Sequence, residues 1–181
     1  MMKIMHIGQR IGGLDIYIKN VIEYADANFF DFVVVQGKKD KTEPISKNGK
    51  LIKTYAVDMY RSIGIKDIAC LLQILKIVRR EQPALIHCHS AKGGIMGRTA
   101  GLLTRTKTLY TPHAYSFLST RSRLKRTVYI FLEKLTKFNA SQLACSNSEQ
   151  VIGEQLIGYK KEKSFVWTNA VPDISKLLKN V

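Results

Sequence analysis

The chain has few acidic residues, prolines and cysteines, and no long hydrophobic run. Its 181 residues include 14 Asp and Glu, 4 Pro and 3 Cys. No apolar run approaches the roughly 18 to 20 residues that span a bilayer, and the opening segment is too short for a secretory signal. No repeat or low-complexity segment is visible, and 45% of the residues are hydrophobic. The sequence therefore predicts an ordered cytoplasmic protein with one sizeable core.

The three cysteines do not suggest a disulfide framework. Cys70, Cys88 and Cys145 are odd in number, widely spaced and set in apolar patterns. This arrangement is typical of reduced structural thiols.

The shortage of acidic residues leaves a large positive charge. The 29 Lys and Arg outnumber the 14 Asp and Glu, so the net charge is +15 and the pI is near 9.8. An anionic partner is expected, and nucleic acid, an acidic membrane surface and phosphorylated small molecules all satisfy that expectation. Charge alone cannot choose among them.

Apolar runs alternate with helical periodicity along the whole chain. Strands are predicted at 4–8, 32–36, 51–57, 84–88, 107–111, 142–145 and 164–167, with an exposed loop at 37–50. Helices are predicted at about 14–25, 68–78, 94–104, 121–138 and 148–156. This order predicts an α/β fold, a Rossmann-like doubly wound parallel sheet with helices on both faces. We expect this domain to cover 1–173, and 174–181 to begin a linker or a second domain.

A glycine-containing segment, Gly8-Gln-Arg-Ile-Gly12-Gly13, joins the first predicted strand to the first helix. Its backbone amides could face an anion at the helix amino terminus. The spacing is not G-x-G-x-x-G, and Gln36 and Gly37 end the second strand where a dinucleotide site would place an acidic residue. A tight turn that needs glycine for its backbone angles is the alternative.

Two histidines lie at the end of the strand predicted at 84–88, one within it and one directly after it. His87 and His89 are two residues apart, so their side chains share one face and can meet the same ligand. A zinc site would need further ligands, and His113 is the plausible addition. The alternative is that the histidines are simply hydrogen-bonded at a strand end.

The residues that follow these histidines also carry polar groups. Ser90 offers a hydroxyl, Lys92 an ammonium, and Gly93 and Gly94 the amides of a helix start. Such groups suit a sugar hydroxyl or a phosphate.

His113 stands at the end of the next strand, directly after Pro112. Proline restricts the backbone on both sides, so this imidazole is held at the sheet edge and could stabilise charge near a reacting group. A histidine with a purely structural role is the alternative. No nucleophile with an oriented base is visible, which disfavours a hydrolase.

Taken in order, several segments resemble the amino-terminal half of a GT-B glycosyltransferase of family 4, the retaining branch, of the bacterial polysaccharide-biosynthesis type. They are Gly12-Gly13, 87–98, 110–113 with Phe117, 131–135, 144–149 and 167–173. The resemblance spans about residues 3 to 173. It departs at Ala114, where the family more often has glycine.

The resemblance implies two Rossmann-like domains, of which the first binds mainly the acceptor and the second mainly a nucleotide-diphosphate sugar. A chain of this extent is then expected to be inactive without its second domain. No metal or other cofactor is expected, because cationic side chains and helix dipoles stabilise the leaving diphosphate.

The resemblance also implies roles for particular residues. His113 would be catalytic and touch the transferred sugar. The residues expected near the donor are Gly12, Gly13 and Asn169. Those expected to face the acceptor, a glycan or lipid-linked sugar, are His89, Ser90 and Lys92.

A basic cluster at the start of the helix predicted at 121–138 fits a lipid-linked acceptor. Arg121, Arg123, Lys125 and Arg126 would contact an acidic membrane at the inner face of the cell. A solvated helix start is the alternative.

A stand-alone basic module that binds anions or nucleic acid is the rival hypothesis. Surfaces that bind nucleic acid mix basic residues with exposed stacking rings, whereas the aromatic residues here fall within helix and strand patterns. No nucleic acid is therefore expected as a partner.

Overall fold

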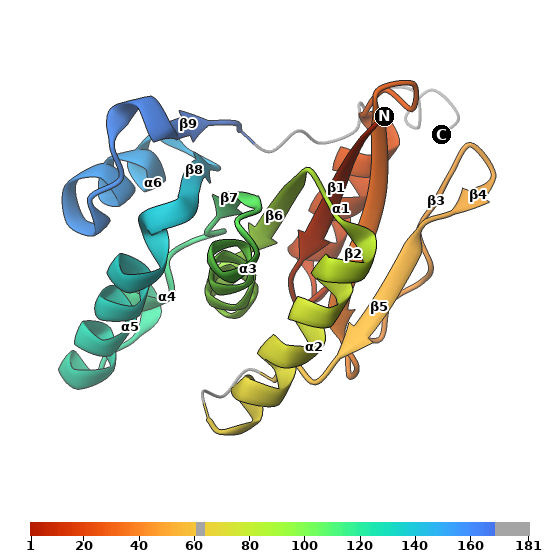
Figure 1. The fold of residues 1–181 in the computed structure, drawn as a ribbon. Helices are drawn as coiled ribbons and strands as arrows, with labels where there is room; N and C mark the ends of the chain where they lie inside the picture. The colour runs from red at the N-terminus through yellow and green to blue at the C-terminus, as the bar shows by residue number, and fades with distance from the viewer. Residues whose placement is uncertain (61–63, 169–181) are drawn as a thin grey trace, which may run out of the picture.

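A computed structural model describes residues 1–60 and 64–168, and its centre is a seven-stranded parallel sheet (Figure 1). The strands are β1 (Met2–Ile7), β2 (Phe30–Gly37), β5 (Lys53–Val57), β6 (Leu85–His89), β7 (Lys107–Thr111), β8 (Ala140–Ala144) and β9 (Ser164–Val166). Their order is β5-β2-β1-β6-β7-β8-β9, with every neighbouring pair parallel. The predicted α/β fold is confirmed. Asn169 and the segment 174–181 lie outside the described residues.

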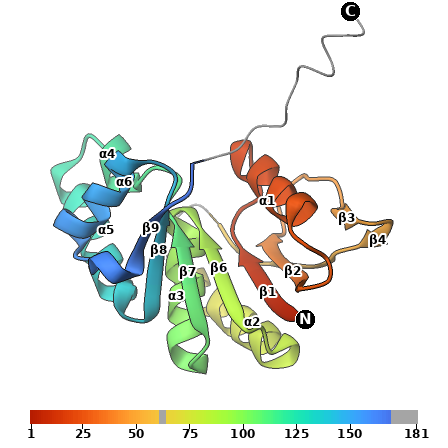
Figure 2. The same cartoon turned by 90° about the horizontal axis from the view of Figure 1, so that it is seen from above.

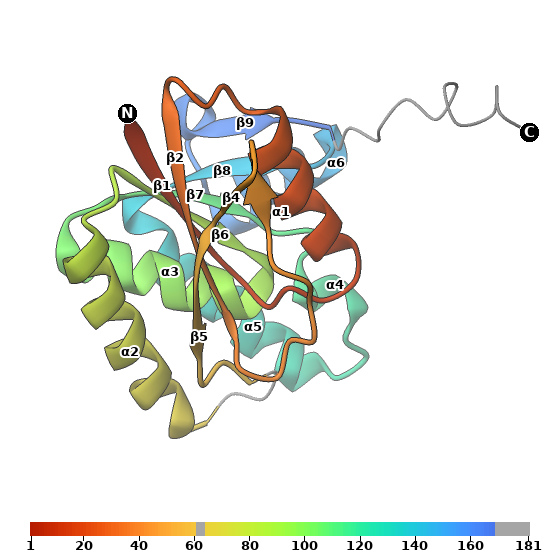
Figure 3. The same ribbon diagram turned by 90° about the vertical axis from the view of Figure 1, so that its right-hand side faces the viewer.

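Helices cover both faces of this sheet. The longer ones are α1 (Gly13–Tyr24), α2 (Lys66–Glu81), α3 (Ser90–Thr104) and α5 (Arg123–Thr136). The shorter ones are α4 (Ser116–Ser119), η1 (Lys137–Asn139), α6 (Asn147–Ile152), η2 (Gly153–Ile157) and η3 (Lys161–Lys163). Helix α1 lies on one face, and α2 and α3 lie on the other (Figures 2 and 3).

Each face has its own hydrophobic cluster because successive side chains of a strand point to opposite faces. In β1, Met5 and Ile7 join the larger cluster with α2 and α3, whereas Ile4 packs against the smaller cluster under α1. The side chain of His6 therefore belongs to the α1 face. It is completely buried there.

Helix α3 begins at Ser90, four residues before the predicted start at Gly94. Gly93 and Gly94 thus lie inside the helix, and the expectation that their amides face a ligand as a helix start is wrong. A Cβ at Gly93 would lie 2.6 Å from the carbonyl oxygen of Ile7, and one at Gly94 would lie 2.3 Å from the ring of Tyr110. These glycines let α3 pack directly on the sheet.

A buried ion pair joins α3 to α5. Arg98 donates to Glu133 at 2.7 Å and to the Tyr159 hydroxyl at 2.9 Å, and the Tyr110 hydroxyl donates to Glu133 at 2.9 Å. Both charged side chains are buried, so each depends on the other to offset its lost hydration.

The start of α5 and the segment 37–50 also differ from the prediction. Helix α5 begins at Arg123, because the hydroxyl of Ser122 accepts a hydrogen bond from the backbone of Lys125 and caps the helix there. Arg121 therefore precedes the helix. The loop predicted at 37–50 contains most of a small antiparallel pair, β3 (Ser46–Lys47) with β4 (Lys50–Leu51).

Candidate functional site

The carboxyl ends of β1, β6, β7 and β8 meet at one edge of the sheet, because these four strands are neighbours and parallel. Gly8 follows β1, and a Cβ at this position would lie 3.1 Å from the Cβ of His89. His113 follows β7, and Cys145 follows β8. This edge is where open α/β sheets bind ligands.

Three imidazoles and a thiol form a chain of contacts along this edge. Nδ1 of His6 lies 2.9 Å from Nε2 of His89, and Nδ1 of His89 lies 3.2 Å from Nε2 of His113. Nδ1 of His113 then lies 3.6 Å from Sγ of Cys145. Both ring nitrogens of His89 and of His113 are thus engaged. We call His6, His89, His113 and Cys145 the imidazole chain.

The fourth histidine of the protein packs beside this chain. Nε2 of His87 lies 2.8 Å from the hydroxyl oxygen of Thr111, and its ring centroid is 4.1 Å from that of His89. His6, His87 and His89 could together hold a metal ion, since their ligand atoms lie within 4.8 Å of one another. In such a group the third ligand is His6, whereas the sequence suggested His113.

Burial keeps the four imidazoles neutral at physiological pH. It lowers the pKa of His6 and of His113 to about 4, and that of His87 and of His89 well below the ordinary value. A neutral imidazole carries one N–H and one lone pair. His113 can therefore donate or accept a hydrogen bond without carrying charge.

The backbone at His113 is held in an unusual conformation. His113 and Ala114 have φ angles of 52° and 69°, in the left-handed region that favours glycine. The buried carboxylate of Glu149 accepts from the backbone N–H of Ala114 and from that of Cys145, both at 2.7 Å. Glu149 thus ties the turn after β7 to the end of β8.

A cavity of about 370 Å³ opens beside His113. Its lining comes from the turn after β7, α4, the end of β8 and α6, namely His113, Ala114, Leu118, Cys145, Ser146, Ser148, Glu149 and Ile152. The structure therefore places the predicted catalytic histidine at a cavity, next to hydroxyl groups that can bind a sugar.

A second cavity, of about 220 Å³, lies between the glycine-containing segment and α3. Gln9, Ile11, Leu14, Ser90, Lys92 and Gly93 line it. The structure therefore brings Ser90 and Lys92 together with the loop after β1. Lys92 is only 8% exposed, and its ammonium pairs with the carboxylate of Asp67 at 2.7 Å.

His89 does not face either cavity. Its side chain is fully buried between the rings of His6 and His113. The expectation that His89 contacts an acceptor directly is therefore not supported by its position in this structure.

The glycine-containing segment is anchored by a buried arginine. The Arg10 guanidinium pairs with Asp15 at 2.6 Å and donates to the side-chain oxygen of Gln36 at 2.8 Å, and the backbone N–H of Arg10 donates to the carboxylate of Asp40 at 2.8 Å. Gly12 has a φ of 59°, and Gly13 begins α1 with no atom within 4 Å of an added Cβ. Gly12 is therefore required for the turn, and Gly13 leaves open space at the helix start. Both remain candidates for the donor site.

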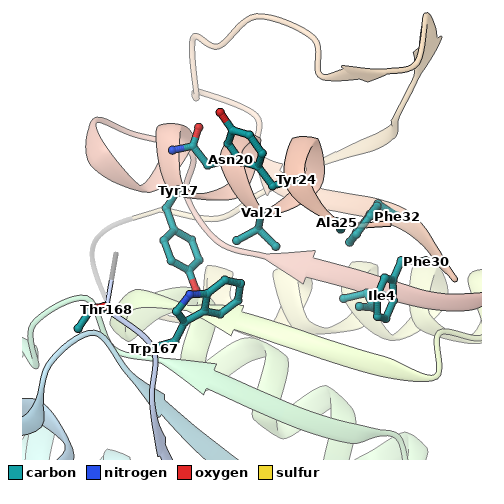
Figure 4. Close-up of a pocket in the computed structure, with 10 residues that line it drawn as sticks. All are labelled: Ile4, Tyr17, Asn20, Val21, Tyr24, Ala25, Phe30, Phe32, Trp167 and Thr168. Atoms are coloured by element: carbon teal, nitrogen blue, oxygen red, sulfur yellow. The ribbon is translucent and has the colours of Figure 1, made fainter. Parts of the chain in front are cut away.

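An apolar groove of about 370 Å³ lies on the α1 face (Figure 4). Its lining comes from α1 and Ala25, β1, β2 and the residues after β9, namely Ile4, Tyr17, Asn20, Val21, Tyr24, Ala25, Phe30, Phe32, Trp167 and Thr168. The ring of Tyr17 also meets the ring of His113 edge-on, with centroids 4.7 Å apart. Tyr17 thus separates this groove from the imidazole chain.

Helix α5 exposes a stripe of apolar side chains beside its basic first turns. Leu124 and Phe131 are 76% and 62% exposed, and Val128 and Leu135 continue the same stripe. Arg121, Arg123, Lys125 and Arg126 are exposed around it. This pattern is typical of a helix that lies in a membrane interface.

His6, Arg10 and Glu149 belong to the site, although sequence reasoning missed them. His6 pairs with His87 in the register of the neighbouring strands β1 and β6, so the two side chains must lie on the same face of the sheet. This pairing would have indicated His6 once the strand order was known. Glu149 lies in the segment 144–149 and stands three residues after Ser146, which caps its helix, but its contact with the turn after β7 arises only in the folded chain.

These features define a Rossmann-like domain with a polar site at the carboxyl edge of its sheet. The sequence profile of Glycosyltransferase Family 4 matches residues 11–173. The chain belongs to this family.

Curated relatives include bacterial glycosyltransferases. An Escherichia coli protein described as UDP-Gal:alpha-D-GlcNAc-diphosphoundecaprenol alpha-1,3-galactosyltransferase is 33% identical over 86 residues, which are 47% of this chain and 22% of that protein. The O-antigen biosynthesis glycosyltransferase WbnH of Escherichia coli is 28% identical over 117 residues, 62% of this chain and 34% of the relative. The matches thus cover only a minor part of these relatives.

Solved structures share the fold at low identity. Anabaena HepE, solved with UDP-glucose, superposes with a TM-score of 0.63 and 18% identity over 99% of this chain and 50% of its own. Acinetobacter baumannii MurG gives a TM-score of 0.61 and 10% identity over 94% of this chain and 47% of its own. The chain thus spans about half the length of these neighbours. Among the described residues, no helix combines the length and apolar character needed to cross a bilayer.

Proposed function

We propose that this chain is the acceptor-side, amino-terminal domain of a retaining glycosyltransferase that transfers a sugar from a nucleotide-diphosphate donor. The observation that carries the proposal is the position of His113, at a cavity on the sheet edge where the polar ends of neighbouring strands meet. The family match over residues 11–173 supports the same chemistry.

In this proposal His113 meets the transferred sugar near its reacting carbon. A neutral imidazole in a water-poor site can hydrogen-bond a sugar oxygen and stabilise the charge that develops during transfer. Its fixed position comes from the Glu149 carboxylate and from His89. No metal or other cofactor takes part.

Gly12 and Gly13 would approach the donor phosphates, which a second domain holds from the opposite side, and Asn169 would also bind the donor. The open space at Gly13 and the helix start of α1 suit a phosphate, because the first amides of a helix lack internal partners. The transfer reaction needs both domains, so we expect no turnover from this domain alone.

The acceptor would be a sugar carried on a lipid diphosphate, or a growing glycan of a surface polysaccharide. Ser90 and Lys92 line the second cavity, where the Lys92 ammonium is held by the carboxylate of Asp67. The galactosyltransferase relative acts on a sugar linked through diphosphate to undecaprenol, as its name states. Such an acceptor lies at a membrane, which fits peripheral binding of the exposed stripe and basic turns of α5 to the inner face.

A transfer assay tests this function in a two-domain protein that carries this chain. Nucleotide-diphosphate sugars are offered with a short-chain prenyl-diphosphate sugar, and the product is identified by mass spectrometry. We expect H113A to lower the transfer rate by about 10²- to 10³-fold, while the melting temperature changes by only a few degrees. Equal rates for H113A and the unchanged protein would remove His113 from the site, and no transfer from any sugar nucleotide would overturn the proposal.

A further inference from the structure

The imidazole chain restricts where its protons can lie. Its three rings meet end to end, because each inter-ring contact joins Nδ1 of one histidine to Nε2 of the next. A hydrogen bond needs one N–H and one lone pair, and each neutral ring supplies one of each. His6, His89 and His113 must therefore all be protonated at Nδ1 or all at Nε2.

The two arrangements differ at the buried end of the chain. Nε2 of His6 is buried and has no hydrogen-bond partner within the part of the chain that the structure describes. If all three rings carry the proton at Nε2, this atom is an N–H without an acceptor. If all three rings carry the proton at Nδ1, Nε2 of His6 is an acceptor whose lone pair meets no donor.

A buried N–H without an acceptor is rarer in proteins than an acceptor without a donor. The far end of the chain gives little preference, since the thiol of Cys145 is both a weak donor and a weak acceptor. The unpartnered His6 nitrogen therefore favours protonation at Nδ1 throughout the chain.

We propose that His6 and His89 are positioning residues that fix the tautomer of His113, so that its Nδ1–H points toward Cys145, which lines the same cavity. His6 donates to His89, and His89 donates to Nε2 of His113. Nε2 of His113 is thus kept as an acceptor, and its one N–H faces Sγ of Cys145 at 3.6 Å, a weak acceptor that also lines the cavity. The orientation of a histidine ring is commonly set by what its other nitrogen bonds.

This proposal deepens the proposed function, since it makes His113 a hydrogen-bond donor to a sugar oxygen. The donor carries no charge, because burial holds the pKa of His113 at about 4. The arrangement of protons does not depend on the reaction, so it can be measured without a transfer assay.

The test is nitrogen-15 NMR of the 181-residue chain labelled at histidine. Protonated and unprotonated imidazole nitrogens resonate far apart, so each ring reveals its tautomer directly. We expect His6, His89 and His113 all to be protonated at Nδ1. A chain protonated at Nε2, a mixture of tautomers along the chain, or a stoichiometric metal ion bound at His6 would each overturn the proposal.

Substitutions test the direction of influence in the same spectra. H6F removes the donor to His89 and should lower the Nδ1–H population of His113 measurably. H6N places an amide nitrogen near the position of Nδ1 and should restore it. H87N is the matched control, because His87 lies in the same cluster but bonds Thr111 outside the chain, so the His113 tautomer should not change. An unchanged His113 signal in folded H6F would contradict the proposal. If the spectra show the expected tautomers but the two-domain protein transfers no sugar, only the proposed function is contradicted.

Discussion

The imidazoles of His89 and His113 are joined end to end, with Nδ1 of the first 3.2 Å from Nε2 of the second. His89 ends β6, and His113 lies two residues after the end of the neighbouring strand β7, so strand pairing and the turn after β7 together set this distance. His89, which looked like a ligand-binding residue in sequence, is instead the buried support of the histidine that reaches a cavity. The site is therefore built in two layers, with exposed groups at the cavities and neutral imidazoles behind them.

The buried histidines should make stability depend on pH. Their folded-state pKa values are lowered, to about 4 for His6 and His113, while the unfolded chain binds protons near 6.5. The unfolded state thus binds more protons between these values, so the free energy of unfolding falls as pH drops from about 6.5 toward 4. Each such histidine contributes up to about 1.4 kcal/mol per pH unit in this window.

Urea unfolding at pH 7.5, 6.5, 5.5 and 4.8 measures this slope, and H6N should reduce it. Hydrogen bonds from Lys53 and Tyr55 lower the pKa of Glu81 from 4.5 to about 2, so its contribution is fully present above about pH 5.5 and adds to the slope only at the lowest pH. A stability that stays flat from pH 7.5 to 4.8 would show that these histidines are not buried as neutral groups.

The close packing of α3 predicts a strong effect of adding one methyl group. In G94A the new Cβ would meet the ring of Tyr110, which cannot move freely because its hydroxyl bonds Glu133. We expect a loss of about 1–3 kcal/mol in the free energy of unfolding. G13A is the control, since nothing lies within 4 Å of its added Cβ, and its stability should be unchanged or slightly raised. Equal chemical-denaturation midpoints for the two variants would contradict this packing.

The ion pair between α3 and α5 should matter for folding rather than for chemistry. E133A leaves the Arg98 charge buried without its partner, which costs about 3–5 kcal/mol. E162A removes an exposed carboxylate 3.9 Å from Lys160, and its cost should stay within about 0.5 kcal/mol. Thermal unfolding of the two variants compares them. A difference below about 1 kcal/mol would mean that water reaches the Arg98 side chain.

Membrane contact by α5 predicts a dependence on lipid charge. The 181-residue chain should co-sediment with vesicles containing anionic lipid more than with neutral vesicles, and R123E with R126E should weaken this binding. Replacing Phe131 with serine should weaken the binding that persists at high salt, because that part comes from apolar insertion. The double variant K160E and K163E is the control, because it changes the net charge by the same amount at positions outside α5. Equal loss in both double variants would indicate a general charge effect, and tighter binding to single-stranded DNA than to vesicles would favour a nucleic-acid partner.

Much of the architecture could be predicted from sequence, because buried parallel strands appear as apolar runs with helical periodicity between them. The strand ending at His89 and the one before His113 were placed almost to the residue. The predicted start of α3 is wrong because the pair Gly93 and Gly94 is typical of a loop. In the folded chain these glycines are needed because α3 packs closely against Ile7 and Tyr110. That contact exists only after the sheet has formed.

The candidate site was predicted in part for the same reason. His113, Ser90 and Lys92 follow strand ends, which periodicity can locate. His6 joins His89 only through strand order, and Glu149 reaches the turn at Ala114 only through tertiary packing. The alternation of residues also does not predict that the His89 side chain is buried. Because it is buried, His89 supports His113 and does not contact a ligand.

We expect the carboxyl edge of this sheet to bind a sugar linked to diphosphate. The most direct measurement is NMR chemical-shift mapping on the 181-residue chain, titrated with a short-chain prenyl-diphosphate sugar. We expect saturable shifts at the backbone amides of Ser90, Lys92, His113 and Ser146. Shifts confined to α5 or to the groove beside Trp167, or no shifts at millimolar ligand, would contradict it.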